Sequence, residues 1–255
     1  MEENRKQKIK KRILQIGVLF FTVYLIAAVI FLTHRIENTV CHDVILIIKD
    51  SVNTGFITKR EITDILQQAK LDPKNKSMDL INTRAIEETL SKHVLIDRVE
   101  CYKTLSGKLC VEVNQRIPIL RIMSRNGENY YIDNKGKVMP VNIKSIIHLP
   151  VATGSVDKSF ATNTLYKLGL FLYKNKFWDA QIEQINVLPK GEIELVPRVG
   201  DQIIFLGTAE NLEQKFDRLH KFYLKVLNEV GWNKYSRINL EFENQIVCTK
   251  RKTKE

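Results

Sequence analysis

The chain has 255 residues and a formal net charge of +11, from 40 Lys and Arg against 29 Asp and Glu. The basic residues are scattered along the chain and do not alternate with aromatic residues, as a surface that stacks nucleic-acid bases would require, so we expect no nucleic-acid partner. With only 11 Gly and 6 Pro, the chain contains no low-complexity linker, and its length suits one large or two small folded domains.

The N-terminal part predicts a membrane anchor. An uncharged apolar stretch runs from Ile13 to Leu32, and its twenty residues would form a helix of about 30 Å, the thickness of a bilayer core. It follows six basic residues, namely Arg5, Lys6, Lys8, Lys10, Lys11 and Arg12. We therefore predict a cytoplasmic tail at 1–12, a single-pass transmembrane helix at 13–33 in the inner (cytoplasmic) membrane, and the remainder outside the cytoplasm. A cleaved signal peptide is disfavoured because no small-residue cleavage site follows.

The next section predicts a small α+β domain. A short apolar strand at 44–48 is followed by a helix that begins at Thr58, where Thr58 and Glu61 have the spacing of a capping box. A second helix begins near Asn82, and a hairpin joins strands at 96–103 and 108–114. The order strand, helix, helix, strand, strand favours two helices on one face of a three-stranded sheet.

The rest of the chain predicts a mixed sheet with flanking helices, which makes the fold class α+β. A helix at 209–230 has apolar residues at spacings of three and four and ends at Gly231. The last strand is expected at 237–247, and a disordered tail at 250–255. The other expected elements are strands at 118–123 and 130–133, an extended segment at 149–154, a helix at 159–174, and strands at 182–187, 192–197 and 202–206.

Neither the cysteines nor the histidines form a reactive site. Strand alternation places Cys101 and Cys110 on opposite sheet faces, so we expect them, with Cys41 and Cys248, to be free, partly buried thiols. The five His residues are widely spaced, and none of the usual catalytic or phosphate-binding motifs occurs. The chain is therefore predicted to have no enzymatic activity, no cofactor, no metal and no small-molecule substrate.

Four short segments, in this order, resemble the FtsQ/DivIB family of bacterial cell-division proteins. They are Val94-Leu-Ile-Asp-Arg-Val99, Val113-Asn-Gln-Arg-Ile-Pro118 with an Arg-x-Pro junction, Tyr130-Tyr-Ile-Asp-Asn-Lys-Gly136 with an Asp-x-x-Gly hairpin, and Leu149-Pro-Val-Ala-Thr-Gly154. The resemblance implies a POTRA domain at 34–116 and a β domain at 117–249. It also implies a non-catalytic scaffold at the division site, bound to membrane-anchored coiled-coil proteins of the FtsB and FtsL type. Such a scaffold would help to recruit and regulate septal peptidoglycan synthesis.

The last predicted strand carries the candidate partner site. Its segment Ile238-Asn-Leu-Glu-Phe242 resembles a family Asp-Leu-Arg-Tyr segment, with Glu241 where an Arg is common and Phe242 in place of Tyr. An exposed edge strand can accept a partner segment as a further strand, although simple sheet closure would explain the same pattern. The candidate partner-binding residues are Arg237, Asn239, Glu241, Phe242, Gln245 and Val247.

Two other functions fit parts of the sequence. A POTRA domain also occurs in chaperones and export components, although these usually carry several POTRA units or a barrel. A membrane-tethered enzyme acting on cell-wall polymer would use a dispersed pair of carboxylates, which a single sequence does not reveal.

Overall fold

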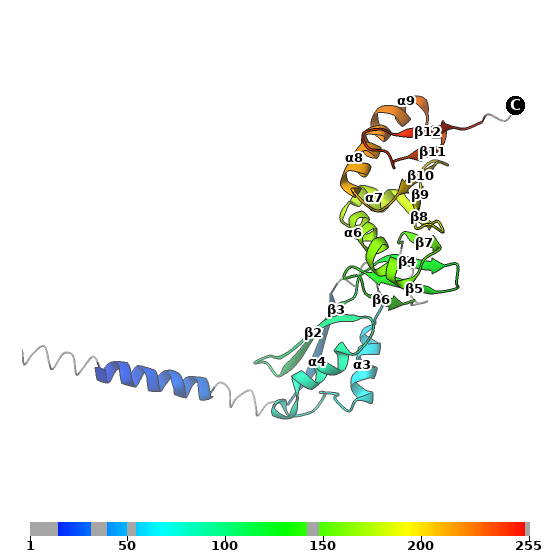
Figure 1. Cartoon of the computed structure of the whole chain (residues 1–255). Helices are drawn as coiled ribbons and strands as arrows, with labels where there is room; N and C mark the ends of the chain where they lie inside the picture. Colours follow the sequence, from blue (N-terminus) through cyan, green and yellow to red (C-terminus); the bar gives the residue numbers. More distant parts are fainter. Residues whose placement is uncertain (1–14, 32–39, 50–54, 142–147, 253–255) are drawn as a thin grey trace, which may run out of the picture. The chain divides into compact units, whose positions relative to one another are not determined.

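The computed structural model describes residues 15–31, 40–49, 55–141 and 148–252. Apart from the N-terminal helix, the described chain forms two compact units (Figure 1). The first unit contains residues 40–49 and 57–114, and the second contains residues 55–56 and 115–252. Each unit is described separately below.

Residues 15–31 form a helix within the predicted membrane span. Its apolar side chains are exposed, including Phe20 at 71% and Phe31 at 67%. Of the predicted span, Ile13, Leu14, Leu32 and Thr33 lie outside the described residues. Among the helices in the described ranges, none has both the length and the apolarity that a bilayer crossing requires, so the predicted span stays a prediction.

The first unit has the predicted order of elements. Strands β1 (Asp43–Lys49), β2 (Ile96–Lys103) and β3 (Lys108–Gln115) form a sheet in the order β1-β3-β2, with β1 parallel to β3. Helices α3 (Lys59–Gln68) and α4 (Thr83–Ser91) pack on this sheet, and a 3₁₀ turn at Met78–Leu80 lies between them in the sequence.

Local sequence signals explain these elements. The Thr58 hydroxyl accepts from the Glu61 N–H at 3.2 Å, and the Glu61 carboxylate accepts from the Thr58 N–H at 2.8 Å, which confirms the predicted capping box. Cys101 belongs to the core, whereas Cys110 lies between the core residues Leu109 and Val111 and so faces the other side of the sheet. All four cysteines are unpaired in the structure.

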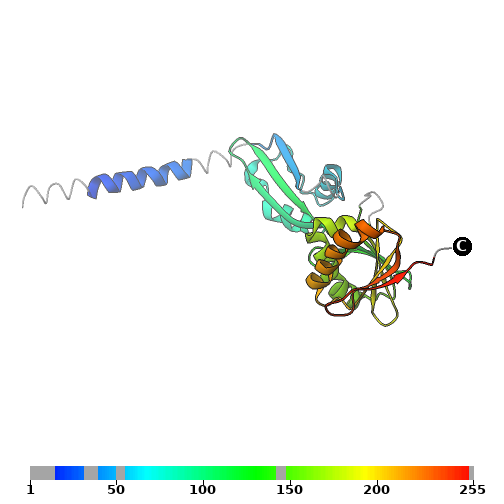
Figure 2. The ribbon, with the colours of Figure 1, turned by 90° about the horizontal axis from the view of Figure 1, so that it is seen from above.

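The second unit is built on one nine-stranded mixed sheet (Figure 2). The strand order is β12-β11-β10-β9-β8-β7-β4-β5-β6. The bounds in chain order are β4 Pro118–Ser124, β5 Asn129–Asp133, β6 Val138–Pro140, β7 Val151–Gly154, β8 Ile182–Val187, β9 Ile193–Pro197, β10 Ile203–Gly207, β11 Tyr235–Asn239 and β12 Val247–Lys250.

Two helical segments cover one face of this sheet (Figure 1). The first contains α5 (Lys158–Phe160), a π-helical turn (Ala161–Leu165), α6 (Tyr166–Lys174) and α7 (Lys176–Gln181). The second contains α8 (Leu212–Phe222), a π-helical turn (Tyr223–Leu227) and α9 (Asn228–Val230). Their apolar faces form the core with the strands, which explains the helical periodicity seen in the sequence.

Three expectations need correction. The predicted strand at 237–247 is instead a hairpin, because the chain leaves β11 after Asn239 and returns as β12 at Val247. The tail begins later than predicted, since Lys250 belongs to β12 and the Arg251 N–H donates to the Lys234 carbonyl at 3.1 Å. Strand β6 and helix α7 were not predicted.

Candidate partner-binding edge

Strand β12 lies at one edge of the nine-stranded sheet. It pairs antiparallel with β11, with Asn239 opposite Val247 and Arg237 opposite Thr249. Within the described ranges, no strand pairs with its other side. An edge strand presents a row of backbone N–H and C=O groups that another chain can pair with, so β12 is the place where a partner strand could extend this sheet.

Two of the predicted site residues, Arg237 and Asn239, lie on the interior strand β11. The Arg237 guanidinium is 2.8 Å from Glu194 Oε1, and its carbon lies 4.5 Å from the centre of the Phe205 ring. The side chain thus reaches across β10 to β9. Arg237 therefore links β11, β10 and β9 through its side chain. Of the six predicted residues, only Val247 lies on the edge strand β12.

Glu241, Phe242 and Gln245 lie in the turn between β11 and β12, which we call the β11–β12 turn (residues 240–246). The turn begins where the Asn239 side-chain oxygen accepts from the Glu241 N–H at 2.8 Å. Asn244 has a left-handed backbone, with φ 61°. Asn readily forms both a side-chain hydrogen bond to the backbone two residues later and a left-handed backbone conformation. Asn239 and Asn244 thus reverse the chain in a turn that contains neither Gly nor Pro.

Helix α8 holds this turn through Arg218. Its Nη2 donates to the carbonyls of Leu240 and Phe242, each at 3.2 Å. Charged donors make stronger hydrogen bonds than neutral ones, so this fork fixes the path of the chain as it leaves β11. Arg218 is a positioning residue for the candidate edge.

One turn earlier on α8, Lys215 is buried, with 6% of its surface exposed. Its ammonium donates to the carbonyls of Leu206 at 2.9 Å and Thr208 at 2.8 Å, at the end of β10. Burial lowers the pKa of Lys215 from its usual value, because an interior position disfavours the charged form. Lys215 thus fixes the start of the crossover from β10 to β11.

The outer surface of the edge combines apolar and polar side chains. Phe242 is 44% exposed and Val247 is 46% exposed, whereas Ile238 and Leu240 are fully buried in the core of the unit. Thr249, Lys250 and Gln245 are also exposed. An added strand would pair with the backbone of β12 and bring its own side chains beside Val247, which makes backbone pairing and apolar contact available together.

Sequence reasoning missed Cys248, Thr249 and Lys250, which form most of the edge strand. The signal was present in the β-branched residues Val247 and Thr249, which favour strands, and in Asn239 and Asn244, which favour turns and precede them.

The Cys248 side chain is half-buried, and burial raises the pKa of its thiol. The edge therefore presents no readily formed thiolate.

Across residues 15–31, 40–49, 55–141 and 148–252, no three His, Cys, Asp or Glu side chains come together as metal ligands. His93 and His220 lie in different units. The features that stand out at the candidate edge are backbone pairing groups and exposed apolar side chains.

Both units match models of known protein families. A family model described as FtsQ/DivIB, C-terminal related, matches residues 117–249, and a model of a POTRA-like domain matches residues 39–114. The cell division protein FtsQ of Geotalea daltonii is 23% identical over 181 residues, which cover 67% of this chain and 64% of that protein. The chain thus aligns with a little less than two thirds of the length of that curated relative. Because the FtsQ/DivIB model alone matches more than half of the 255 residues, and a POTRA-like domain precedes it, the chain belongs to the FtsQ/DivIB family of cell-division proteins.

Proposed function

We propose that this protein is a membrane-anchored, non-catalytic scaffold of the division machinery that binds partner proteins by strand addition at β12. The observation that carries the proposal is the open side of β12, next to the exposed side chains of Phe242 and Val247. Membership of a cell-division family supports the cellular setting. The partners would be membrane-anchored coiled-coil proteins of the FtsB and FtsL type, and the complex would recruit septal peptidoglycan synthase.

The proposed anchor is the predicted span at 13–33. Six basic residues precede it, which favours a cytoplasmic N-terminus and a location of both folded units outside the cytoplasm. The helix at 15–31 is apolar on all sides, and a lipid environment would cover those side chains. In this arrangement the two units would act at the outer face of the cytoplasmic membrane, at the division site.

The six predicted residues take different roles in this proposal. Val247, Phe242 and Gln245 would contact the partner, because they are exposed at or beside the edge. Arg237 and Asn239 would shape the hairpin from within the sheet. Glu241 is exposed and would favour a basic residue on the partner, where the family's usual Arg would favour an acidic one.

The binding experiment compares two exposed valines. Full-length protein carrying Val247→Asp should capture an FtsB/FtsL-type partner at least tenfold less well than wild type, since the carboxylate would lose water beside the side chains of the added strand. Val199→Asp is the control, because Val199 is 47% exposed against 46% for Val247 and lies outside the edge. Equal capture by the two variants would exclude the edge as the binding site.

Hydrogen exchange separates strand addition from other modes of docking. Strand addition should slow the exchange of backbone amides within residues 247–250 when the partner binds, because amides on the outer side become paired. If a partner binds without slowing the exchange of these amides, it docks elsewhere.

In cells, depletion of the protein should give long filaments without septa, and normal division after depletion would exclude the cellular role.

A further inference from the structure

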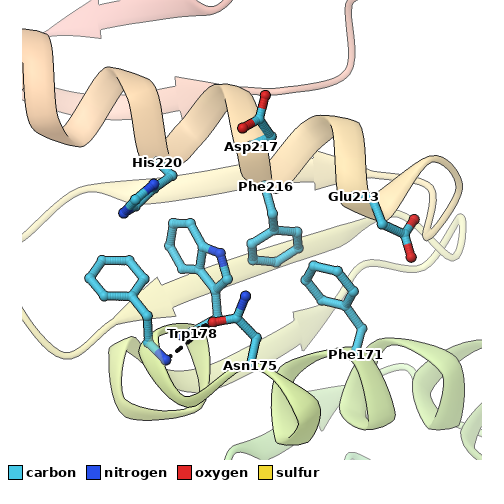
Figure 3. Close-up of a pocket in the computed structure, with 8 residues that line it drawn as sticks. Phe171, Asn175, Trp178, Glu213, Phe216, Asp217 and His220 are labelled. Atoms are coloured by element: carbon cyan, nitrogen blue, oxygen red, sulfur yellow. Dashed lines mark hydrogen bonds between the residues drawn. The ribbon is translucent and has the colours of Figure 1, made fainter.

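A row of aromatic rings lines a groove between α6–α7 and α8 in the second unit (Figure 3). Neighbouring rings in the row have their centres 4.8–4.9 Å apart, as edge-on or tilted pairs. These spacings are typical of favourable aromatic contacts. In order along the row, the rings are Phe171, Phe216, Trp178, Phe177 and His220.

The groove has a buried floor and an open mouth. Trp178 and Phe216 are 3% and 1% exposed, whereas Phe177 is 39% exposed. The volume of the groove is about 290 Å³. Pockets for drug-sized ligands have volumes of about 300–1,000 Å³, so this groove suits a single side chain better than a large ligand.

Two carboxylates stand at the rim. Glu213 and Asp217 lie one turn apart on α8 and are exposed beside the rings (Figure 3). Asp217 is 2.6 Å from the Lys221 ammonium, but exposed pairs of this kind are weak and exchange readily. Glu213 forms no ion pair with any residue in the described ranges. Glu213 and Asp217 are the two acidic residues among those that line the groove, and no Lys or Arg in the described part of the chain lines it.

We propose that the groove, formed by Phe171, Phe177, Trp178, Phe216 and His220 with Glu213 and Asp217 at its rim, binds an arginine side chain of a partner protein. A guanidinium is attracted to aromatic faces within about 6 Å and pairs with carboxylates through its planar fork. The occupant is chosen by charge complementarity, because a cation would pair with the two carboxylates that line the groove, whereas an apolar side chain would not. The site shares no residue with the β12 edge, so it goes beyond the strand-addition proposal.

The binding test uses Trp178 as its own reporter. The chain has two Trp residues, so full-length protein with Trp232→Phe reports on Trp178 alone. The protein is purified in mild detergent and titrated with N-acetyl-arginine amide at constant ionic strength. We expect a saturable change in Trp178 fluorescence. The citrulline amide has nearly the same shape without the charge, and it should give no such change.

Carboxylate variants identify the source of the selectivity. A double variant with Glu213→Gln and Asp217→Asn should bind the arginine amide about tenfold more weakly. Each exposed charge contact is expected to contribute about threefold, and the two factors multiply. The matched control is Glu229→Gln, an exposed acid on α9 that does not line the groove. Circular dichroism checks that each variant is folded.

The proposal would be overturned by no saturable change with the arginine amide, by an equal response to the citrulline amide, or by unchanged affinity in the double variant. Stronger binding of N-acetyl-leucine amide would assign the groove to an apolar side chain instead, and would also overturn it. The assay contains no partner strand, so its failure would leave the role of β12 unaffected.

Discussion

Arg116 and Asp133 form an ion pair in which the Asp133 side chain is almost fully buried, at 1% exposure. Arg116 Nη2 and Nε lie 2.7 Å and 2.8 Å from Asp133 Oδ2, and the other carboxylate oxygen accepts from the N–H groups of Lys135 and Lys137. Arg116 comes from the Arg-x-Pro segment and Asp133 from the Asp-x-x-Gly hairpin. Two segments that are separate in the sequence are thus joined by one buried ion pair, at the start of the sheet of the second unit.

Removing one partner of this pair should be severe. Arg116→Ala should lower the free energy of unfolding by about 3–5 kcal/mol, because it leaves the Asp133 carboxylate buried without its counter-charge. Urea denaturation of the full-length protein measures the loss. Arg84→Ala is the control: Arg84 pairs with Glu88 at 2.9 Å, but both side chains are exposed, so it should cost at most about 0.5 kcal/mol. Similar losses in the two variants would contradict a special role for the buried pair.

Two glycines with similar backbones should respond differently to alanine. Gly154 has φ +93° and Gly127 has φ +89°, but a Cβ at Gly154 would lie 2.2 Å from the Val187 carbonyl oxygen, whereas one at Gly127 would meet nothing within 4 Å. Gly127→Ala should therefore cost only about 1–2 kcal/mol for the left-handed backbone. Gly154→Ala should prevent β7 from pairing normally with β8, and the second unit should fail to fold. Equal melting temperatures for the two variants would refute this explanation.

The thiol of Cys101 should make the protein sensitive to alkali. Burial raises the pKa of Cys101 from 9.0 to about 12, so between these values the unfolded chain has lost a proton that the native chain keeps. The stabilisation from the protonated thiol is complete below pH 9 and declines as the pH rises toward 12, by about 1.4 kcal/mol per pH unit for one proton. Cys101→Ala should remove this part of the slope, as measured by urea denaturation at several pH values. Parallel pH profiles for wild type and variant would exclude Cys101 as its source.

Arg218→Ala should loosen the β11–β12 turn without unfolding the unit. The carbonyls of Leu240 and Phe242 would lose a charged donor, and a hydrogen bond of that type contributes about 1.5–3 kcal/mol. Backbone amides in residues 240–250 should then exchange faster, and partner capture should fall. Lys225→Ala is the control, because Lys225 is exposed in the π-helical turn that continues α8 and does not line the aromatic groove, and it should change neither quantity. Normal exchange in Arg218→Ala would mean that the turn is held by other contacts.

Elements with a strong local signal were predictable from the sequence. The capping box of α3, the alternation in β2 and β3, and the spacing in α8 each depend on residues close together in the chain. The helix at 159–174 was predicted from Ala161, Leu165, Leu168 and Leu172, and all four are fully buried.

The β11–β12 hairpin was missed because its pattern imitates one continuous strand. Ile238, Leu240 and Phe242 alternate with polar residues, and the turn contains neither Gly nor Pro. The reversal depends on the Asn239 side chain, on Asn244 in a left-handed conformation, and on Arg218 from α8. The last of these contacts is between residues far apart in the sequence.

The same limit applies to the site residues. Arg237 was assigned to partner contact because of its place in a predicted edge strand, but its charge is paired with Glu194, 43 residues earlier. The aromatic groove brings Phe171 and Trp178 together with Phe216 and His220, and periodicity within a single helix does not reveal that pairing.

The sheet order of the second unit has a consequence for how the protein is made. From β8 to β12, each strand pairs with the one synthesised just before it. Every newly made strand in this series therefore covers the margin left by its predecessor, so that unpaired backbone is hidden step by step as the polypeptide elongates. Within the described chain no strand pairs with the outer side of β12, and a strand from another molecule would continue the same series of additions.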